Sequence, residues 1–494
     1  MNPRSWGAIS DGIRHIAGRD VASQLVRIGA QLVAAGVVPG QPVALVASNT
    51  LSSALTLLAL MQQGQTVVLV PAVDRAEHAL PLPRFVSLRL APRAMLPAGS
   101  GTAADDPLPP LADWLELSVP EGRTELAADS PLRQGQLLLR TSGSLGAPKW
   151  VRHSLVSLVQ NADLARARLA LSDADRVLVP VPLAHMYGLG AAFLPALLAG
   201  ACVELLPGAN LLRYLDAERR FQPTLGFLTP GLCATLVRPR ASTASYRAVV
   251  IAGDRLSPEL QTQAEACYGQ VNNLYGSTEM GVICATPPGE TPAGRVGPPL
   301  PGVTLRVQPA AGDERLADPD GPSDGADPGS LDIAAASSAD VGELHCLHPC
   351  GFVGYVDDDG QPLGGPGADG YATRDLGRLH PDGSVDVLGR LDHATKRDGR
   401  LVMLAEVERA LCALPAVERA AVLLGPPTLR GPTLLAFVSP RPGAELEASS
   451  VLRQCQARLP SFAVPDDLRV LSALPLLPSG KLDRQALQRL LPAP

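Results

Sequence analysis

A short loop that begins at Thr141 combines two glycines, three hydroxyl side chains and one lysine in nine residues, TSGSLGAPK. It follows an apolar run, QLLLR at 136–140, that is typical of a strand. Glycines let backbone N–H groups converge on an anion, hydroxyls such as those of Ser142 and Ser144 donate further hydrogen bonds, and Lys149 adds positive charge. The spacing differs from the Gly-x-x-x-x-Gly-Lys phosphate loop. The composition indicates phosphate binding, although an ordinary polar turn uses the same residue types.

Lysine is scarce in this chain, which has only three lysines among 42 basic residues. Besides Lys149, they are Lys396 in KRDGR and Lys481 in PSGKLDR, and all three segments contain glycine. The lysine ammonium is a compact point charge, whereas the arginine guanidinium is a planar fork. Positions that keep lysine in an arginine-rich chain are therefore candidates for contact with an anion in a confined site.

A second segment, NNLYGSTE at 272–279, places an aromatic ring, a hydroxyl and a carboxylate close together. The face of Tyr275 can stack on a purine base, and the Thr278 hydroxyl can reach a phosphate. The Glu279 carboxylate can hold Mg²⁺ beside phosphate oxygens. These residue types suit a nucleotide with its metal ion.

The elements that must position these segments alternate along the chain. Residues 21–71 have the pattern of helix, turn, strand, helix and strand. Strands alternating with helices predict a parallel, doubly wound sheet. The acidic, small-residue segment 309–340 predicts a mobile surface loop. Further apolar runs typical of buried strands lie at 136–140, 176–182, 201–207, 225–229 and 248–253.

Composition excludes several classes of protein. A net charge of -6 without a basic stripe argues against nucleic acid as a partner, and 3% aromatic residues offer few stacking platforms. Eight cysteines without a disulfide-like spacing, and an N-terminus without a signal pattern, predict a cytoplasmic protein. The longest apolar stretch, 188–203, is short for a bilayer and contains glycine and proline, so no membrane span is expected.

The loop at 141–150 resembles the Thr-Ser-Gly-Ser-Thr-Gly-x-Pro-Lys-Gly loop of the adenylate-forming superfamily. This superfamily contains acyl- and aryl-CoA synthetases, peptide-synthetase adenylation domains and luciferases. Leu145 replaces the usual threonine and Trp150 the usual glycine. The resemblance implies binding of ATP with Mg²⁺. The residues implied to hold the phosphates are Thr141, Ser142, Gly143, Ser144, Gly146 and Lys149.

Other segments match the same family in the same order, from about residue 25 to 486. They are AGDRLSPEL at 252–260, NNLYGSTE at 272–279, YATRDLG at 371–377 and GRLD at 389–392. Glu279 is implied as the Mg²⁺ ligand, and Arg374 stands where the family usually has glycine. The other implied contacts are Gly253 and Asp254 at the adenine, Tyr275 with Gly276 as an adenine or substrate wall, Thr278 at the α-phosphate, Asp375 at the ribose hydroxyls, and Arg390 at the nucleotide.

Lys481 matches the catalytic lysine near the C-terminus of this family. An ammonium between the attacking carboxylate and the α-phosphate offsets their repulsion, and one charge pair at 4 Å is worth about 4 kcal/mol at an effective dielectric constant of about 20. Such preorganised charge is often the largest catalytic contribution. The resemblance also implies a pivot at Asp392 and a thiol-acceptor face that contains Lys396 and Gly399.

The predicted fold is α/β with two domains. A large N-terminal domain, 1–388, has doubly wound sheets and a small barrel-like β region, and it holds the ATP and acid pocket. A hinge at 389–392 leads to a small mobile α+β domain, 393–494, that carries Lys481.

The implied reaction joins a carboxylic acid to a thiol after forming an acyl-adenylate. The segment PLAHMYG at 182–188 contains no acid to pair with an amino-acid ammonium, which disfavours an amino-acid substrate. His185 would border the carboxylate, although a lone histidine can equally be a core residue. Tyr187 and Phe193 would form flat pocket walls, with Asn273 also in the pocket. We expect a small aryl acid, hydroxybenzoate-like, transferred to an acyl carrier protein as in stand-alone ligases of aryl-polyene pathways; a medium-chain fatty acyl-CoA or aryl-CoA synthetase is the alternative.

Three other classes are compatible with parts of the sequence. A luciferase-type oxygenase shares the adenylation motifs, and an inactive homologue could bind nucleotide without turnover. The segment HCLHPC at 345–350 contains zinc-ligand residue types. It lacks a second ligand pair at zinc-site spacing, and its beginning fits a strand, so we do not expect a zinc site.

Overall fold

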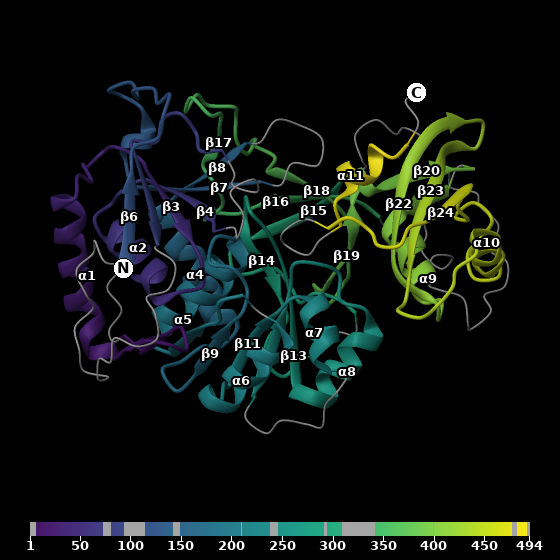
Figure 1. The fold of residues 1–494 in the computed structure, drawn as a ribbon, viewed down its shortest axis with the longest axis horizontal. Coiled ribbons are helices and arrows are strands. Elements are labelled where there is room, and N and C mark those ends of the chain that lie inside the picture. The colour runs from purple at the N-terminus through teal and green to yellow at the C-terminus, as the bar shows by residue number, and fades with distance from the viewer. Residues whose placement is uncertain are drawn as a thin grey trace. The chain divides into compact units, whose positions relative to one another are not determined.

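The computed structural model divides into two compact units. The first comprises 1–306, 345–373 and 379–387, and the second comprises 307–344, 374–378 and 388–494. Both contain helices and sheets, which agrees with the predicted α/β class (Figure 1). The structure describes residues 6–72, 81–92, 114–141, 149–208, 210–237, 246–290, 294–308, 341–398, 400–476 and 482–491.

An eight-stranded sheet in the order β14-β13-β12-β11-β9-β10-β1-β2 forms one part of the first unit. The neighbouring strands from β13 to β1 are parallel, as the alternating pattern predicts. Side chains of α6, α7 and α8 pack against one face in a continuous apolar cluster. The strands are β1 (Ile9–Ser10), β2 (His15–Ile16), β9 (Arg176–Val179), β10 (Cys202–Leu205), β11 (Leu225–Leu228), β12 (Ala248–Ile251), β13 (Gln270–Ser277) and β14 (Gly281–Ala285).

A seven-stranded sheet in the order β17-β8-β7-β4-β3-β5-β6 forms the other part. Its two central pairs, β3 with β4 and β4 with β7, are parallel. Strands β7 and β8 are antiparallel and flank the predicted phosphate loop, and β17 joins β8 from far along the chain. The strands are β3 (Val43–Ala47), β4 (Val67–Pro71), β5 (Leu88–Pro92), β6 (Leu115–Ser118), β7 (Gln136–Arg140), β8 (Trp150–Ser154) and β17 (Gly354–Val356).

Helices of the first unit begin at residues suited to that position. Thr50, Ser154, Asn210 and Ser257 each accept a hydrogen bond from the first turn of the helix that follows. The apolar run at 188–203 is a π-helix, η3 (Tyr187–Phe193), continued by α5 (Leu194–Ala199) and β10. The other helices are α1 (Gly18–Ala34), α2 (Leu51–Gln62), η2 (Pro131–Arg133), α4 (Leu155–Arg168), α6 (Leu211–Phe221), α7 (Pro230–Val237) and α8 (Pro258–Tyr268).

Asn49, which follows β3, links the two sheets of the first unit. Its buried amide donates to the carbonyl oxygens of Val179 (3.0 Å) and Val181 (2.9 Å), and its oxygen accepts from the Leu183 amide (2.8 Å). Because a buried polar group without a partner is costly, these bonds fix the distance between the strand ends.

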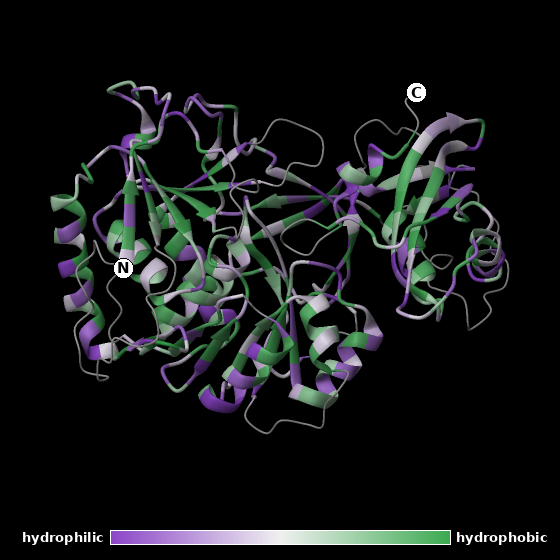
Figure 2. Ribbon diagram, viewed as in Figure 1, coloured by the Kyte–Doolittle hydropathy of each residue, from purple (hydrophilic) through white to green (hydrophobic). Residues whose placement is uncertain are grey.

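A four-stranded sheet has the order β15-β16-β18-β19. The second unit has a β20-β21 hairpin and a β22-β23-β24 sheet, with α9 and α10 packed on the latter in one apolar cluster. Hydrophobic segments run along the strands of the seven- and eight-stranded sheets and along β22 and β23 (Figure 2). The elements are β15 (Thr304–Gln308), β16 (Gly342–Leu347), β18 (Tyr371–Leu379), β19 (Val385–Arg390), η5 (Leu391–His393), β20 (Ala394–Arg397), β21 (Arg400–Met403), α9 (Leu404–Cys412), β22 (Val417–Thr428), β23 (Gly431–Pro440), α10 (Ala448–Gln456), β24 (Asp467–Val470) and α11 (Arg484–Gln488).

Sequence periodicity located most elements around the motifs. The predicted strands at 136–140 and 248–253 correspond to β7 and β12, and the start of HCLHPC lies in β16, as expected. The predicted loop at 309–340 lies outside the described residues. Among the helices that the structure describes, none is long and apolar enough to span a bilayer.

Trp150 replaces the usual family glycine and packs in the core of the seven-stranded sheet. Its side chain is 1% exposed and lies in a cluster with Phe85, Leu138 and Val356. Its indole Nε1 donates to Asp358 at 2.7 Å. The substitution therefore anchors one end of the predicted phosphate loop.

We expect Trp150→Gly to lower the free energy of unfolding by about 3 kcal/mol or more, because it empties a large buried site. Trp150→Phe keeps much of the packing but removes the donor to Asp358, and should cost about 1–2 kcal/mol. Urea unfolding of both variants measures the difference. A Trp150→Gly protein within 1 kcal/mol of the parent would contradict the anchoring role.

Candidate nucleotide site

The ends of the predicted phosphate loop are held together by the sheet. Arg140 and Trp150 are register partners in β7 and β8, and the Thr141 amide donates to the Lys149 carbonyl at 3.3 Å. The Lys149 side chain is exposed, and its Nζ lies 5.4 Å from the ring centre of Tyr355. The predicted phosphate contacts Ser142, Gly143, Ser144 and Gly146 lie outside the described residues.

The segment NNLYGSTE forms the end of β13 and the turn to β14. Tyr275 is 9% exposed, and the strand register shifts between Tyr275 and Gly276. A Cβ at Gly276 would lie 2.2 Å from the Gly281 carbonyl oxygen, so only glycine permits this close approach. The motif glycine thus has a steric role in the turn.

Three hydrogen bonds fix the peptide groups and side chain around Glu279. His153 Nε2 donates to the Thr278 carbonyl at 2.7 Å, and the Phe352 amide donates to the Glu279 carbonyl at 2.8 Å. The Tyr355 hydroxyl donates to Glu279 Oε1 at 2.9 Å. The partners come from β8 and from 352–355, and sequence reasoning did not find them because they lie far from the motif along the chain.

His153 is 1% exposed and projects from β8. Burial lowers its pKa to about 4, while the hydrogen bond to the Thr278 carbonyl opposes the shift. The imidazole is therefore neutral at pH 7, with its proton on Nε2, the nitrogen that faces the carbonyl.

Asn161 and His348 anchor the residues that follow Glu279. The Asn161 amide donates to the Met280 carbonyl at 3.1 Å and accepts from the Val282 amide at 3.1 Å. His348 Nδ1 accepts from the Cys350 amide at 3.0 Å, and its Nε2 lies 3.0 Å from the Val282 carbonyl oxygen and 2.8 Å from the Asn161 amide nitrogen. Both ring nitrogens of His348 thus lie within hydrogen-bond distance of protein groups around the strand that follows Glu279.

Phe352, Tyr355 and Tyr371 form an aromatic cluster beside Glu279. Phe352 makes edge contacts with Tyr355 (4.9 Å between centroids) and Tyr371 (5.2 Å), and the two tyrosine hydroxyls lie 3.0 Å apart. Burial raises the pKa of Tyr371, and the neighbouring Glu279 carboxylate raises it further. Tyr371 therefore stays a protonated phenol at neutral pH.

Gly253 and Asp254 follow β12, which pairs in parallel with β13 through Ile251 and Asn273. The φ angle of Gly253 is +93°, which favours glycine. Asp254 is exposed, and its Oδ1 accepts from the Arg255 amide at 2.8 Å. Both predicted adenine contacts thus lie in the turn after a strand adjacent to the one that carries Tyr275.

Asp375 and Arg390 meet within the second unit. Arg390 Nη1 lies 3.3 Å from Asp375 Oδ1, and Asp375 is 8% exposed. Arg374 has a φ angle of +62°, and its amide donates to Glu343 Oε1 at 3.1 Å. Arginine therefore adopts here the left-handed conformation that the usual family glycine would supply.

The residues predicted for the acid pocket have different environments. The His185 side chain is exposed. The Tyr187 ring lies edge-on to that of Phe227, with 6.1 Å between the ring centroids. The Tyr187 hydroxyl lies 3.0 Å from the Leu228 carbonyl and 2.9 Å from that of Val250, and burial raises its pKa. Asn273 is buried and donates to the Arg295 carbonyl at 3.1 Å. Tyr187 and Asn273 thus use polar atoms in backbone hydrogen bonds.

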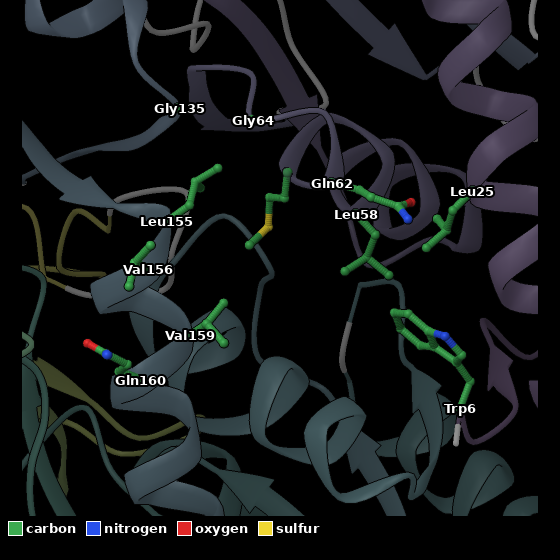
Figure 3. Close-up of a pocket in the computed structure, with 11 residues that line it drawn as sticks. Trp6, Leu25, Leu58, Gln62, Gly64, Gly135, Leu155, Val156, Val159 and Gln160 are labelled. Carbon is green, nitrogen blue, oxygen red and sulfur yellow. The ribbon is translucent and has the colours of Figure 1, made fainter. Parts of the chain in front are cut away.

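A cavity of about 470 Å³ lies elsewhere in the first unit (Figure 3). Its walls are mainly apolar side chains of α1, α2 and α4, including Leu25, Leu58, Val156 and Val159. None of the predicted site residues lines it. We therefore do not assign this cavity to the acid substrate.

The donor set around Glu279 suits a metal ion that arrives with a nucleotide. Within the described ranges, no group of three or more His, Cys, Asp and Glu side chains could enclose a metal ion. Mg²⁺ commonly binds through one or two protein carboxylates together with phosphate oxygens and water. Glu279 accepts one hydrogen bond from Tyr355, and a carboxylate has further acceptor positions.

The structure describes the backbone of two of the four residues predicted for the hinge, the catalytic lysine and the thiol-acceptor face. Lys481 and Gly399 lie outside the described residues. The backbone of Asp392 lies in η5, and that of Lys396 lies in β20 opposite Leu401. Their predicted roles, and the predicted domain and hinge boundaries, remain proposals.

Two family models match the chain. The AMP-binding enzyme model matches residues 103–326, and the AMP-binding enzyme C-terminal domain model matches 406–481. The chain belongs to the AMP-binding enzyme family, which confirms the resemblance to adenylate-forming enzymes.

Relatives include large synthetases and single ligases. The chain is 29% identical, over 97% of its length, to a probable non-canonical nonribosomal peptide synthetase, CymA, of Salinispora arenicola, and it spans 6% of that protein. It is 26% identical over 97% of its length to a methyl-dioxo-octahydroindenyl-propanoyl:CoA ligase of Rhodococcus jostii, and covers 95% of that ligase. The structure of ATP-bound MatB from Rhodopseudomonas palustris shares the fold, with a TM-score of 0.75 and 21% identity over 99% of this chain and 97% of that chain. The family and the ligase relative support an AMP-forming acid–thiol ligase.

The buried His153 should make stability depend on pH. Its pKa falls from an ordinary 6.5 to about 4 on folding, so the unfolded chain binds more protons between these values and stability falls as pH drops through this window. His153→Gln keeps an N–H donor for Thr278 but does not titrate. Between pH 6.5 and 4, we expect the free energy of unfolding of the parent to fall by up to about 3 kcal/mol more than that of His153→Gln. Denaturant unfolding of both proteins across this pH range measures the difference. If the two free energies of unfolding fall equally with pH, the lowered pKa of His153 is refuted.

Proposed function

We propose that the chain is an AMP-forming ligase that activates a small carboxylic acid and passes the acyl group to a phosphopantetheine thiol. The observation that supports this most is the approach of Lys149 and Glu279, from two separate motifs, to the same tyrosine ring and hydroxyl. One group suits phosphate oxygens and the other suits their metal ion.

The first half-reaction forms the acyl-adenylate. A carboxylate oxygen attacks the α-phosphorus of ATP, the bond from that phosphorus to the bridging oxygen breaks, and pyrophosphate leaves. Lys149 holds the terminal phosphates, Thr278 contacts the α-phosphate, and Lys481 offsets the repulsion between the reacting anions. Mg²⁺ bound by Glu279 would supply neutralising charge on the phosphates.

Residues of the C-terminal part take the remaining roles. Asp375 binds the ribose hydroxyls, and Arg390, which lies 3.3 Å from it, contacts the nucleotide. Rotation about Asp392 then withdraws Lys481 and presents the face with Lys396 and Gly399. The thiol sulfur attacks the acyl carbonyl carbon. The bond between that carbon and the phosphate oxygen breaks, and AMP leaves with its electron pair.

For the acid, we favour a small aryl acid, hydroxybenzoate-like, transferred to an acyl carrier protein. The absence of acidic residues from 182–188 disfavours an amino-acid ammonium, and the Tyr187 ring contacting Phe227 supports a flat wall, with His185 nearby in sequence. The peptide-synthetase relative supports a carrier protein as acceptor, whereas the CoA-ligase relative supports CoA. A medium-chain fatty acyl-CoA or aryl-CoA synthetase is therefore the second candidate.

Pyrophosphate release with Mg·ATP and a panel of carboxylic acids, without a thiol, tests the proposal. We expect release with benzoate-type acids only. Release with fatty acids would overturn the aryl assignment but keep adenylation. No release with any acid would favour an inactive nucleotide-binding homologue, and an oxygen-dependent product would favour an oxygenase.

Lys481→Ala should reduce pyrophosphate release at least about a hundredfold while nucleotide affinity stays nearly unchanged, because the lysine acts on the transition state. Arg489→Ala, which removes an exposed cation from the same terminal segment, is the control. A loss of less than about tenfold would exclude the catalytic role of Lys481.

A further inference from the structure

Tyr355 occupies an unusual position between two groups of opposite charge. The chain has only seven tyrosines, yet two of them, Tyr355 and Tyr371, contact each other and Phe352 beside the candidate site. The cluster fixes the plane of the Tyr355 ring from one side. The Lys149 ammonium lies over the Tyr355 ring, and the Glu279 carboxylate accepts a hydrogen bond from the Tyr355 hydroxyl.

The ring and the hydroxyl of Tyr355 make different contacts. The Lys149 ammonium lies 5.4 Å from the ring centre, within the range of a cation–π interaction. The hydroxyl donates to Glu279 Oε1 at 2.9 Å and lies 3.0 Å from the Tyr371 hydroxyl. One rigid side chain therefore contacts both the cation and the carboxylate.

Lys149 and Glu279 form no ion pair with each other in the part of the chain that the structure describes. A direct pair would offset both charges, and Mg·ATP would have to break it before binding. A cation over an aromatic face keeps its hydrogen-bond donors available, and a carboxylate that accepts from the hydroxyls of Tyr355 and Tyr371 keeps further acceptor positions for a metal ion.

We propose that Tyr355 is a positioning residue that keeps Lys149 apart from Glu279 and directs each toward its own part of Mg·ATP. This inference rests on the proposed function. Tyr355 acts through the two charged groups, with the ring serving Lys149 and the hydroxyl serving Glu279.

Two substitutions separate these parts. Tyr355→Phe removes only the hydroxyl, whereas Tyr355→Leu removes the ring face as well. Tyr214→Phe is the control, because the Tyr214 hydroxyl, like that of Tyr355, lies close to another tyrosine hydroxyl, that of Tyr246 at 2.9 Å, although Tyr214 is buried and Tyr355 is partly exposed. Thermal unfolding of each variant establishes that it is folded.

The primary measurement is calorimetric binding of ATP with Mg²⁺ and with EDTA, which does not depend on turnover. Tyr355→Phe should weaken Mg·ATP binding about five- to tenfold, since Glu279 loses its orienting bond, and leave metal-free ATP binding within about twofold. Tyr355→Leu should weaken both, since Lys149 can then pair with Glu279. The ratio of the Tyr355→Leu dissociation constant to that of the parent should shrink between about 0.05 M and 0.5 M salt, because Lys149 is exposed and Glu279 partly so, and salt screens such a pair.

Unchanged Mg·ATP affinity in both Tyr355 variants would overturn the inference. The inference would also be overturned if Tyr355→Leu weakened ATP binding by a factor that does not change with salt. It would likewise be overturned if Tyr214→Phe weakened Mg·ATP binding as much as Tyr355→Phe does. If Tyr355→Leu fails to fold, the Mg²⁺-specific effect of Tyr355→Phe decides the role of the hydroxyl. Pyrophosphate release by the parent tests the proposed function separately, so the two can fail independently.

Discussion

Buried hydrogen bonds between two sheets determine where the candidate site lies. His153 in β8 of the seven-stranded sheet donates to the turn between β13 and β14 of the eight-stranded sheet. Asn161 in α4 adds two hydrogen bonds beside the same turn, to Met280 and Val282. Elsewhere in the same unit, Asn49 joins the end of β3 to the end of β9. Since each buried group would be costly without its partner, the sheets cannot shift without disturbing Glu279.

The sequence allowed the motifs and their strands to be predicted, because the apolar periods and the glycine-rich turns are local features. The strands at 136–140 and 248–253, and the nucleotide motifs after them, needed no knowledge of distant residues. His153 and Tyr355 could not be found in this way. Their partners, Thr278 and Glu279, are separated from them by long stretches of chain, and a single sequence gives spacing but not pairing.

Departures from the family pattern gain a physical explanation from the structure. Trp150 fills a core site and bonds to Asp358, and Arg374 accepts a left-handed backbone with φ of +62°. Non-glycine residues in this conformation cost roughly 1–2 kcal/mol, so the bond from the Arg374 amide to Glu343 offsets part of a real strain. Leu145, the third departure, lies outside the described residues.

Arg140 and Trp150 pair across β7 and β8 at the two ends of the predicted phosphate loop. The sheet already holds the two ends of the loop at the spacing of neighbouring strands, so the entropy of closing the loop belongs to folding and not to ligand binding. Substitutions between these ends can therefore change affinity without changing the stability of the sheet. The predicted nucleotide contacts and the residues that pair in the sheet are thus different residues in this part of the chain.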